Sequence, residues 1–188
     1  FVSFRQVDGL DFTGAYDMLT WVISELYKKH LYLLESDRIN ECDKEIARQL
    51  IRGNASLKDT KGSLMLLTRL LQQYYRKPVI LLIDEYDVAV AKANSNGYYK
   101  EMLDVMKGLM QALKDNQALR FAIITGCLKI AKESIFTGTN NFVSDTITNS
   151  RLNEYFGFVQ REVDQLLQDA DLMERADRMK EWYDGCLL

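Results

Sequence analysis

Three acidic residues follow a run of apolar residues in the segment PVILLIDEYDVAV, residues 78–90. A carboxylate at the end of a strand, such as Asp84, can hold a magnesium ion, usually through water because Mg²⁺ gives up its hydration shell reluctantly. The next residue, Glu85, points to the opposite side of the strand, where a glutamate can orient or deprotonate an attacking water. We therefore interpret Asp84 as a candidate metal residue and Glu85 as a candidate general base. Asp87 could cap the following segment or contact a partner group.

These acids have more than one interpretation. Apolar residues followed by Asp-Glu are the pattern of a Walker B strand, in which the acids serve phosphate hydrolysis. Alternatively, the acids simply begin a loop after a buried strand, where water returns and helix caps are needed. A third interpretation is a two-metal nuclease site, which requires a further carboxylate and usually a lysine on an adjacent strand. The sequence shows no such partner for the acids.

A second polar cluster follows the apolar segment LRFAIITG, residues 119–126. Its Thr125 hydroxyl could hydrogen-bond an attacking water or a γ-phosphate, although a threonine at a strand end more often satisfies a turn. Lys129 and Lys132 come soon afterwards and could supply positive charge to phosphate. Together with the first cluster, Thr125 favours a nucleotide-hydrolysing site over a plain loop.

The elements that must position these residues follow from the apolar pattern. Residues 1–4, 79–83 and 119–125 are predicted strands, and residues 142–148 are a candidate for one more. The run VILLI is too short for a helix and too uniformly apolar for an exposed strand, so we expect it to be buried on both faces, as in parallel sheets. Residues 94–97, NSNG, are a predicted turn. The predicted helices cover residues 14–34, a segment through Ile46 and Leu50 that ends at Gly53, and residues 57–75, 98–115, 154–170 and 174–185.

Strands separated by helices indicate an α/β protein with a mainly parallel sheet. In such sheets ligands bind at the carboxyl ends of the strands, where both polar clusters lie. We expect an α/β core over residues 1–150 and the start of a helical, lid-like region over residues 151–188.

Composition limits the class of protein. The 188 residues are 47% hydrophobic and 27% charged with a net charge of −3, so the charge does not indicate a nucleic-acid partner. No apolar run reaches the length of a membrane span. Three widely separated cysteines without a CxxC pair, together with a single histidine, argue against zinc and favour a reducing, cytoplasmic setting.

The chain resembles the predicted AAA-ATPase-like family over nearly its whole length. The resemblance rests on five ordered segments: PVILLIDEYDVAV, GYYKEMLDVMKGLMQALKDN, FAIITGCLKIAKESIFTGTNNF, EYFGFVQREVDQLL and KEWYDG. It implies a P-loop NTPase core with three αβα layers, related to the STAND and archaeal ATPase branches and often fused to a PD-(D/E)xK nuclease-like domain. It also implies ATP and Mg²⁺ as cofactors of the parent protein.

By residue, Asp84 and Glu85 match the family's Walker B acids, and Thr125 matches the position after its sensor strand. The resemblance also implies nucleotide-binding roles for Lys129, Ser134 and Asn141, although the family often has arginine where Lys129 stands.

The chain departs from the family in one important respect, because no GxxxxGK[ST] loop occurs in it. This loop supplies most of the phosphate affinity of such proteins. We therefore expect a fragment that begins after the Walker A strand, binds nucleotide weakly or not at all by itself, and exposes an apolar sheet edge at residues 119–125. A missing N-terminal segment or a second copy of the chain would cover that edge. The competing hypothesis is a non-enzymatic assembly module derived from an NTPase.

Overall fold

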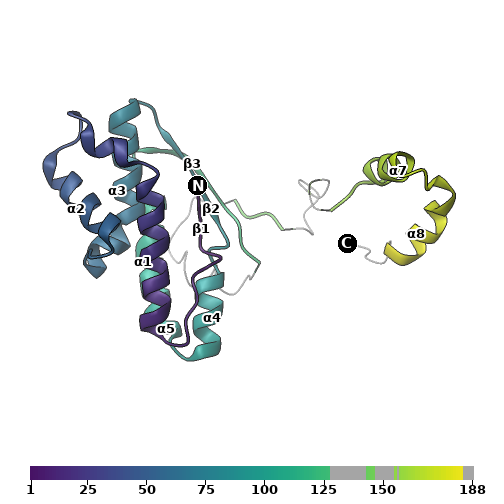
Figure 1. The fold of residues 1–188 in the computed structure, drawn as a ribbon, viewed down its shortest axis with the longest axis horizontal. Coiled ribbons are helices and arrows are strands. Elements are labelled where there is room, and N and C mark those ends of the chain that lie inside the picture. Colours follow the sequence, from purple (N-terminus) through teal and green to yellow (C-terminus); the bar gives the residue numbers. More distant parts are fainter. Residues whose placement is uncertain (128–142, 147–154, 156, 184–188) are drawn as a thin grey trace. The chain divides into compact units, whose positions relative to one another are not determined.

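The computed structural model describes residues 1–127, 143–146, 155 and 157–183 (Figure 1). The chain divides into two compact units, Phe1–Thr139 and Asn140–Leu188. The domain boundary predicted at residues 150 and 151 falls among residues that the structure does not describe.

Three parallel strands form the sheet of the first unit, in the order β1-β2-β3. They are β1 (Val2–Ser3), β2 (Val79–Asp84) and β3 (Leu119–Ile124). Ser3 lies opposite Asp84, and Ile83 lies opposite Ile124. Because all strands run the same way, their carboxyl ends meet at one edge of the sheet. The sequence-based prediction of an α/β fold with a parallel sheet is confirmed.

Helices form most of the first unit. They are α1 (Phe12–Lys28), the 3₁₀ turn η1 (Leu31–Glu35), α2 (Glu41–Arg52), α3 (Leu57–Tyr75), α4 (Val88–Asn96), α5 (Tyr99–Met110) and the 3₁₀ turn η2 (Gln111–Leu113). Three of them begin at a capping side chain, because Asp11, Asn40 and Ser56 each accept a hydrogen bond from a backbone N–H three residues further on. Gly53 ends α2 in the left-handed conformation, with a φ of 72°.

The hydrophobic core lies between the helices and one face of the sheet. Leu81 and Ile83 point into it from β2, and Leu19 of α1, Leu64 of α3 and Met102 of α5 are fully buried there. Figure 1 shows α1, α2 and α3 gathered on one side of the sheet. The alternation of side chains along a strand places every second residue of β2 against these helices.

The opposite face of the sheet is apolar and exposed. Ile80 of β2 pairs with Phe121 of β3, and Leu82 pairs with Ile123. Their exposed fractions are 49%, 45%, 37% and 53%, respectively. The prediction that the VILLI strand is buried on both faces is therefore wrong for this chain. Within the described residues β3 pairs with β2 alone, so its outer edge is open as expected.

Two further expectations need correction. Residues 94–96 of the predicted NSNG turn belong to the last turn of α4, and Gly97 caps this helix with a φ of 86°. Of the candidate strand at residues 142–148, the structure describes residues 143–146, which form no strand.

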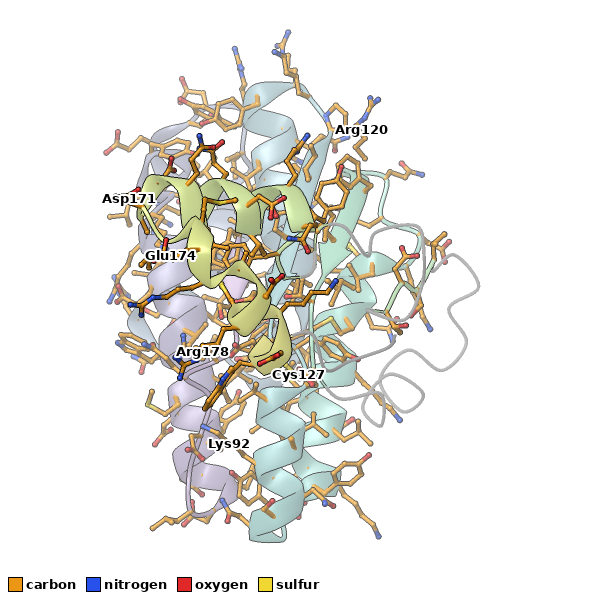
Figure 2. All side chains as sticks on the ribbon, turned by 90° about the vertical axis from the view of Figure 1, so that its right-hand side faces the viewer. Lys92, Arg120, Cys127, Asp171, Glu174 and Arg178 are labelled. Atoms are coloured by element: carbon orange, nitrogen blue, oxygen red, sulfur yellow. The ribbon has the colours of Figure 1, made fainter. Side chains whose placement is uncertain are left out.

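In the second unit, the structure describes helices from residue 160 onward. They are α7 (Gln160–Asp169), the 3₁₀ turn η4 (Met173–Arg175) and α8 (Ala176–Tyr183). Figure 2 labels Asp171, Glu174 and Arg178 on this unit. Among the described helices, none combines the length and the apolar composition needed to cross a bilayer.

Candidate functional site

Polar side chains from β1, from β2 and from the residue directly after β3 meet at the carboxyl edge of the sheet. The Thr125 hydroxyl donates a hydrogen bond to Oδ1 of Asp84 at 2.6 Å. The Ser3 hydroxyl donates to Oδ2 of the same carboxylate at 3.1 Å. Asp84 ends the central strand, so its carboxylate receives one hydroxyl from each neighbouring strand. We call Ser3, Asp84 and Thr125 the strand-end triad.

Backbone hydrogen bonds continue the sheet around this triad. The N–H of Phe4 donates to the carbonyl oxygen of Asp84 at 3.0 Å, and the N–H of Thr125 donates to that of Ile83 at 2.9 Å. The N–H of Tyr86 then donates to the carbonyl oxygen of Thr125 at 3.2 Å. The backbone around the triad is therefore hydrogen-bonded between strands. Such a backbone fixes the positions of the triad side chains more closely than a free loop would.

Glu85 follows the triad in a backbone conformation that residues with a side chain rarely adopt. Its φ is 51°, in the left-handed region. Its carbonyl oxygen accepts the N–H of Val88 at 3.3 Å, which closes the turn into α4. The side chain is half-buried beside the strand ends. Strained non-glycine residues cluster at functional sites, and the conformation costs about 1–3 kcal/mol.

Asp87 joins the turn after β2 to the segment after β3. It stands at the N-cap of α4, yet its side chain makes no capping bond to that helix. Instead, its Oδ2 accepts the N–H of Cys127 at 2.9 Å, and the residue is 1% exposed. Of the two roles that the sequence left open for Asp87, the side-chain cap is not formed, because the carboxylate instead links, as a brace, the residues that follow two strands. The contact with a partner group stays a prediction.

Gly126 fits closely against this brace. A Cβ at Gly126 would lie 2.5 Å from Cε1 of Tyr86 and 2.7 Å from Oδ1 of Asp87. Burial, and to a lesser degree the neighbouring Asp87 carboxylate, raise the pKa of Tyr86 to about 12, so this phenol stays neutral at physiological pH. Only glycine leaves room for the segment after Thr125 to pass this close to Tyr86.

The segment after β1 is bonded to α4 and to Tyr98, which follows α4 in the chain. Lys92 of α4, labelled in Figure 2, forms an ion pair with Asp8 at 2.8 Å. The hydrogen bond from Lys92 is the main reason that the pKa of Asp8 is lowered. The Tyr98 hydroxyl donates to the carbonyl oxygen of Gly9 at 2.7 Å. These contacts hold in place the segment that follows Ser3 in the chain, around Asp8 and Gly9.

The sequence-predicted site residues divide into two groups. Asp84 and Thr125 come together in the triad, and Glu85 follows directly. Lys129, Ser134 and Asn141 lie outside the described residues, and their predicted nucleotide-binding roles remain predictions. Cys127 is the last residue that the structure describes before this gap. Figure 2 shows Cys127 and Arg120 toward opposite ends of the sheet.

Sequence reasoning missed Ser3, Asp87 as a brace, and the close fit of Gly126. A signal for Ser3 was present, because it is the only polar residue in the apolar stretch FVSF. Its register against Asp84, however, depends on strand pairing across 81 residues, which no local pattern encodes.

The donor set of the triad fits a hydrated magnesium ion. Mg²⁺ takes oxygen ligands, keeps several of its waters, and is commonly held through one or two carboxylates. The triad offers one carboxylate and two hydroxyl oxygens. In the part of the chain that the structure describes, no group of three or more His, Cys, Asp or Glu side chains is arranged to hold a metal ion.

The Asp87 brace leads to a first prediction. Asp87→Ala should lower the free energy of unfolding by about 1–3 kcal/mol, because the N–H of Cys127 loses a charge-assisted hydrogen bond. Asp87→Asn retains an oxygen acceptor and should cost less. Urea denaturation of the three proteins measures the difference, and equal stability of Asp87→Ala and the unaltered chain would show that the brace contributes nothing.

A parallel sheet that helices cover on one face, with polar residues at its carboxyl edge, is consistent with a partial P-loop-like α/β fold. Comparison with known families agrees with this class. Residues 4–136 match the AAA-ATPase-like family, described as predicted AAA-ATPase, and the chain belongs to this family.

One relative among curated proteins is an uncharacterized protein in the vnfD 5′ region of Azotobacter chroococcum mcd 1. It is 30% identical over 109 residues, which are 57% of this chain and 21% of that protein. The matched part of the chain thus corresponds to about a fifth of the relative's length. No solved structure matches the chain.

Proposed function

We propose that this chain is the Walker B and sensor portion of a magnesium-dependent ATPase. The observation that carries the proposal is the contact between Thr125 and Asp84, which joins the two strand ends that the sequence singled out. Membership of the AAA-ATPase-like family supports nucleotide as the ligand class. The parent protein, rather than this chain alone, would carry out hydrolysis.

Each strand-end residue has a distinct part in the proposed reaction. Asp84 would hold a magnesium ion through the ion's water molecules, and the bound ion would neutralise developing charge on the phosphates. Glu85 takes a proton from the attacking water and orients it. Thr125 donates its single hydroxyl proton to Asp84, so its oxygen remains free only to accept a hydrogen bond, as from the attacking water.

The uncovered sheet face supports a partner for this chain. Parallel sheets are nearly always covered on both faces. Here Ile80, Leu82, Phe121 and Ile123 form an exposed apolar patch beside an open strand edge. We propose that another segment of the parent protein, or else a second copy of the chain, covers it. A monomer in size-exclusion chromatography that binds no hydrophobic dye would contradict this.

Nucleotide affinity of the chain alone should be low, because it contains no GxxxxGK[ST] loop. The test of the proposed function is therefore ATP hydrolysis by a protein that carries this chain together with a phosphate-binding loop. We expect release of phosphate that requires Mg²⁺ and stops when the ion is chelated. Nucleotide binding without any turnover would instead favour the non-enzymatic assembly module.

We also propose a cytoplasmic location. Cys42 and Cys127 are free thiols in the described part of the chain, and thiols stay reduced in the cytosol.

A further inference from the structure

We propose that Ser3 is a positioning residue that orients the Asp84 carboxylate toward a hydrated divalent cation. The inference rests on the proposed cation site and adds to it a residue from a third strand. Ser3 does not contact the reacting atoms in this scheme; it acts through Asp84.

The need for a second hydroxyl follows from the geometry of an aspartate side chain. The terminal torsion of aspartate is broad, so a carboxylate held at one oxygen can still pivot about that contact. Thr125 holds Oδ1 at 2.6 Å from β3, and Ser3 holds Oδ2 at 3.1 Å from β1. Because the two donors come from opposite neighbours of β2, together they fix the plane of the carboxylate.

The hydroxyl of Ser3 is itself directed toward Asp84. Its oxygen accepts the N–H of Arg5 at 3.4 Å, which leaves its single proton to donate to the carboxylate. Ser3 is half-buried, and it lies directly opposite Asp84 in the parallel register. The contacts of Asp8 and Gly9 with α4 and Tyr98 hold the following segment and limit its movement away from β2.

The orientation leaves the carboxylate able to bind a hydrated cation. An ionised carboxylate has about four lone-pair sites on its two oxygens. Ser3 and Thr125 each use one, on different oxygens, so each oxygen keeps a site for a metal-bound water. A fixed carboxylate binds such waters without first losing torsional freedom, which is the general advantage of preorganisation.

The test measures binding of Mn²⁺, a paramagnetic substitute for Mg²⁺, to the complete 188-residue chain. Broadening of backbone amide signals near residues 83–85 in NMR spectra reports the site, and its dependence on Mn²⁺ concentration gives the affinity. Ser3→Ala should weaken the apparent affinity about 3- to 10-fold, the range expected for loss of one hydrogen bond. Ser3→Thr, which restores a hydroxyl in a strand, should return it to within about twofold.

Two reference variants separate the possible outcomes. Ser95→Ala removes an exposed hydroxyl from the last turn of α4, where it donates to the carbonyl oxygen of Ala91, and should leave the affinity unchanged. Asp84→Asn should abolish the broadening near residues 83–85. If Ser3→Ala lowers the unfolding temperature but binds Mn²⁺ as the unaltered chain does, Ser3 is structural only and the inference is overturned, while the cation site stands. Absence of broadening near Asp84 in the unaltered chain would overturn the cation site and the inference together.

Discussion

Asp84→Asn should lower Mg²⁺-dependent ATP hydrolysis by about 100-fold or more in a protein that carries this chain and a phosphate-binding loop. Asparagine has nearly the same shape and keeps one oxygen, so the Thr125 hydroxyl retains an acceptor. The negative charge that attracts the cation is lost, and the amide group cannot accept the hydrogen bond from Ser3. The measurement is the steady-state rate of phosphate release at saturating ATP over a range of Mg²⁺ concentrations.

Asp17→Asn is the matched control for this change. Asp17 is exposed on α1 and makes no contact with the strand-end triad, so its loss of charge should leave the rate unaltered. If Asp84→Asn hydrolyses ATP as fast as Asp17→Asn does, Asp84 does not hold the cation.

Gly126→Ala should disrupt the site through its geometry rather than its charge. The added Cβ would lie 2.5 Å from Cε1 of Tyr86 and 2.7 Å from the Asp87 carboxylate, closer than real Cβ contacts come. Overpacking of this kind costs about 1–3 kcal/mol of stability. We also expect the segment to shift and to separate the Thr125 hydroxyl from Asp84, with a fall in hydrolysis of about tenfold, equivalent to one hydrogen bond.

Gly62→Ala gives a sharp comparison, because the same methyl group is added where nothing lies within 4 Å. Gly62 is in the middle of α3, so alanine there should stabilise the chain by about 0.5–1 kcal/mol. Thermal unfolding of both variants should therefore move in opposite directions. A Gly126→Ala variant as stable as Gly62→Ala would mean that the close contact with Tyr86 is not maintained in solution.

The strand ends were predictable from the sequence because their signals are local. A short apolar run followed by acids predicted β2 and Asp84, and the same pattern predicted β3 and Thr125. Since parallel strands share a carboxyl edge, the two clusters were expected to meet, and the hydrogen bond between Thr125 and Asp84 confirms that they do. The helices α2, α3 and α5 were predicted for a similar reason, from the helical spacing of their apolar residues.

The features that were missed depend on tertiary contacts. The helix α4 ends in Asn-Ser-Asn, residues with low helix propensity, and burial of Val90 and Ala93 against the core overrides that preference. The exposure of Ile80 was missed because an apolar strand is the same in sequence whether or not its second face is covered. Ser3 and Asp87 act on residues far along the chain, and only the folded arrangement brings them to the site.

The decisive measurement is a single turnover of ATP by the parent protein with and without Glu85→Gln. Glutamine has the same size as glutamate and places no new demand on the left-handed backbone at this position, so stability and ATP binding should be preserved. It cannot accept the proton of the attacking water, and removal of a general base typically lowers the rate about 10²- to 10⁴-fold. Glu101→Gln, at an exposed position on α5, is the control. We predict that Glu85→Gln holds ATP uncleaved while Glu101→Gln converts it to ADP at the unaltered rate; equal conversion by both variants would contradict the assignment of the strand-end acids to hydrolysis.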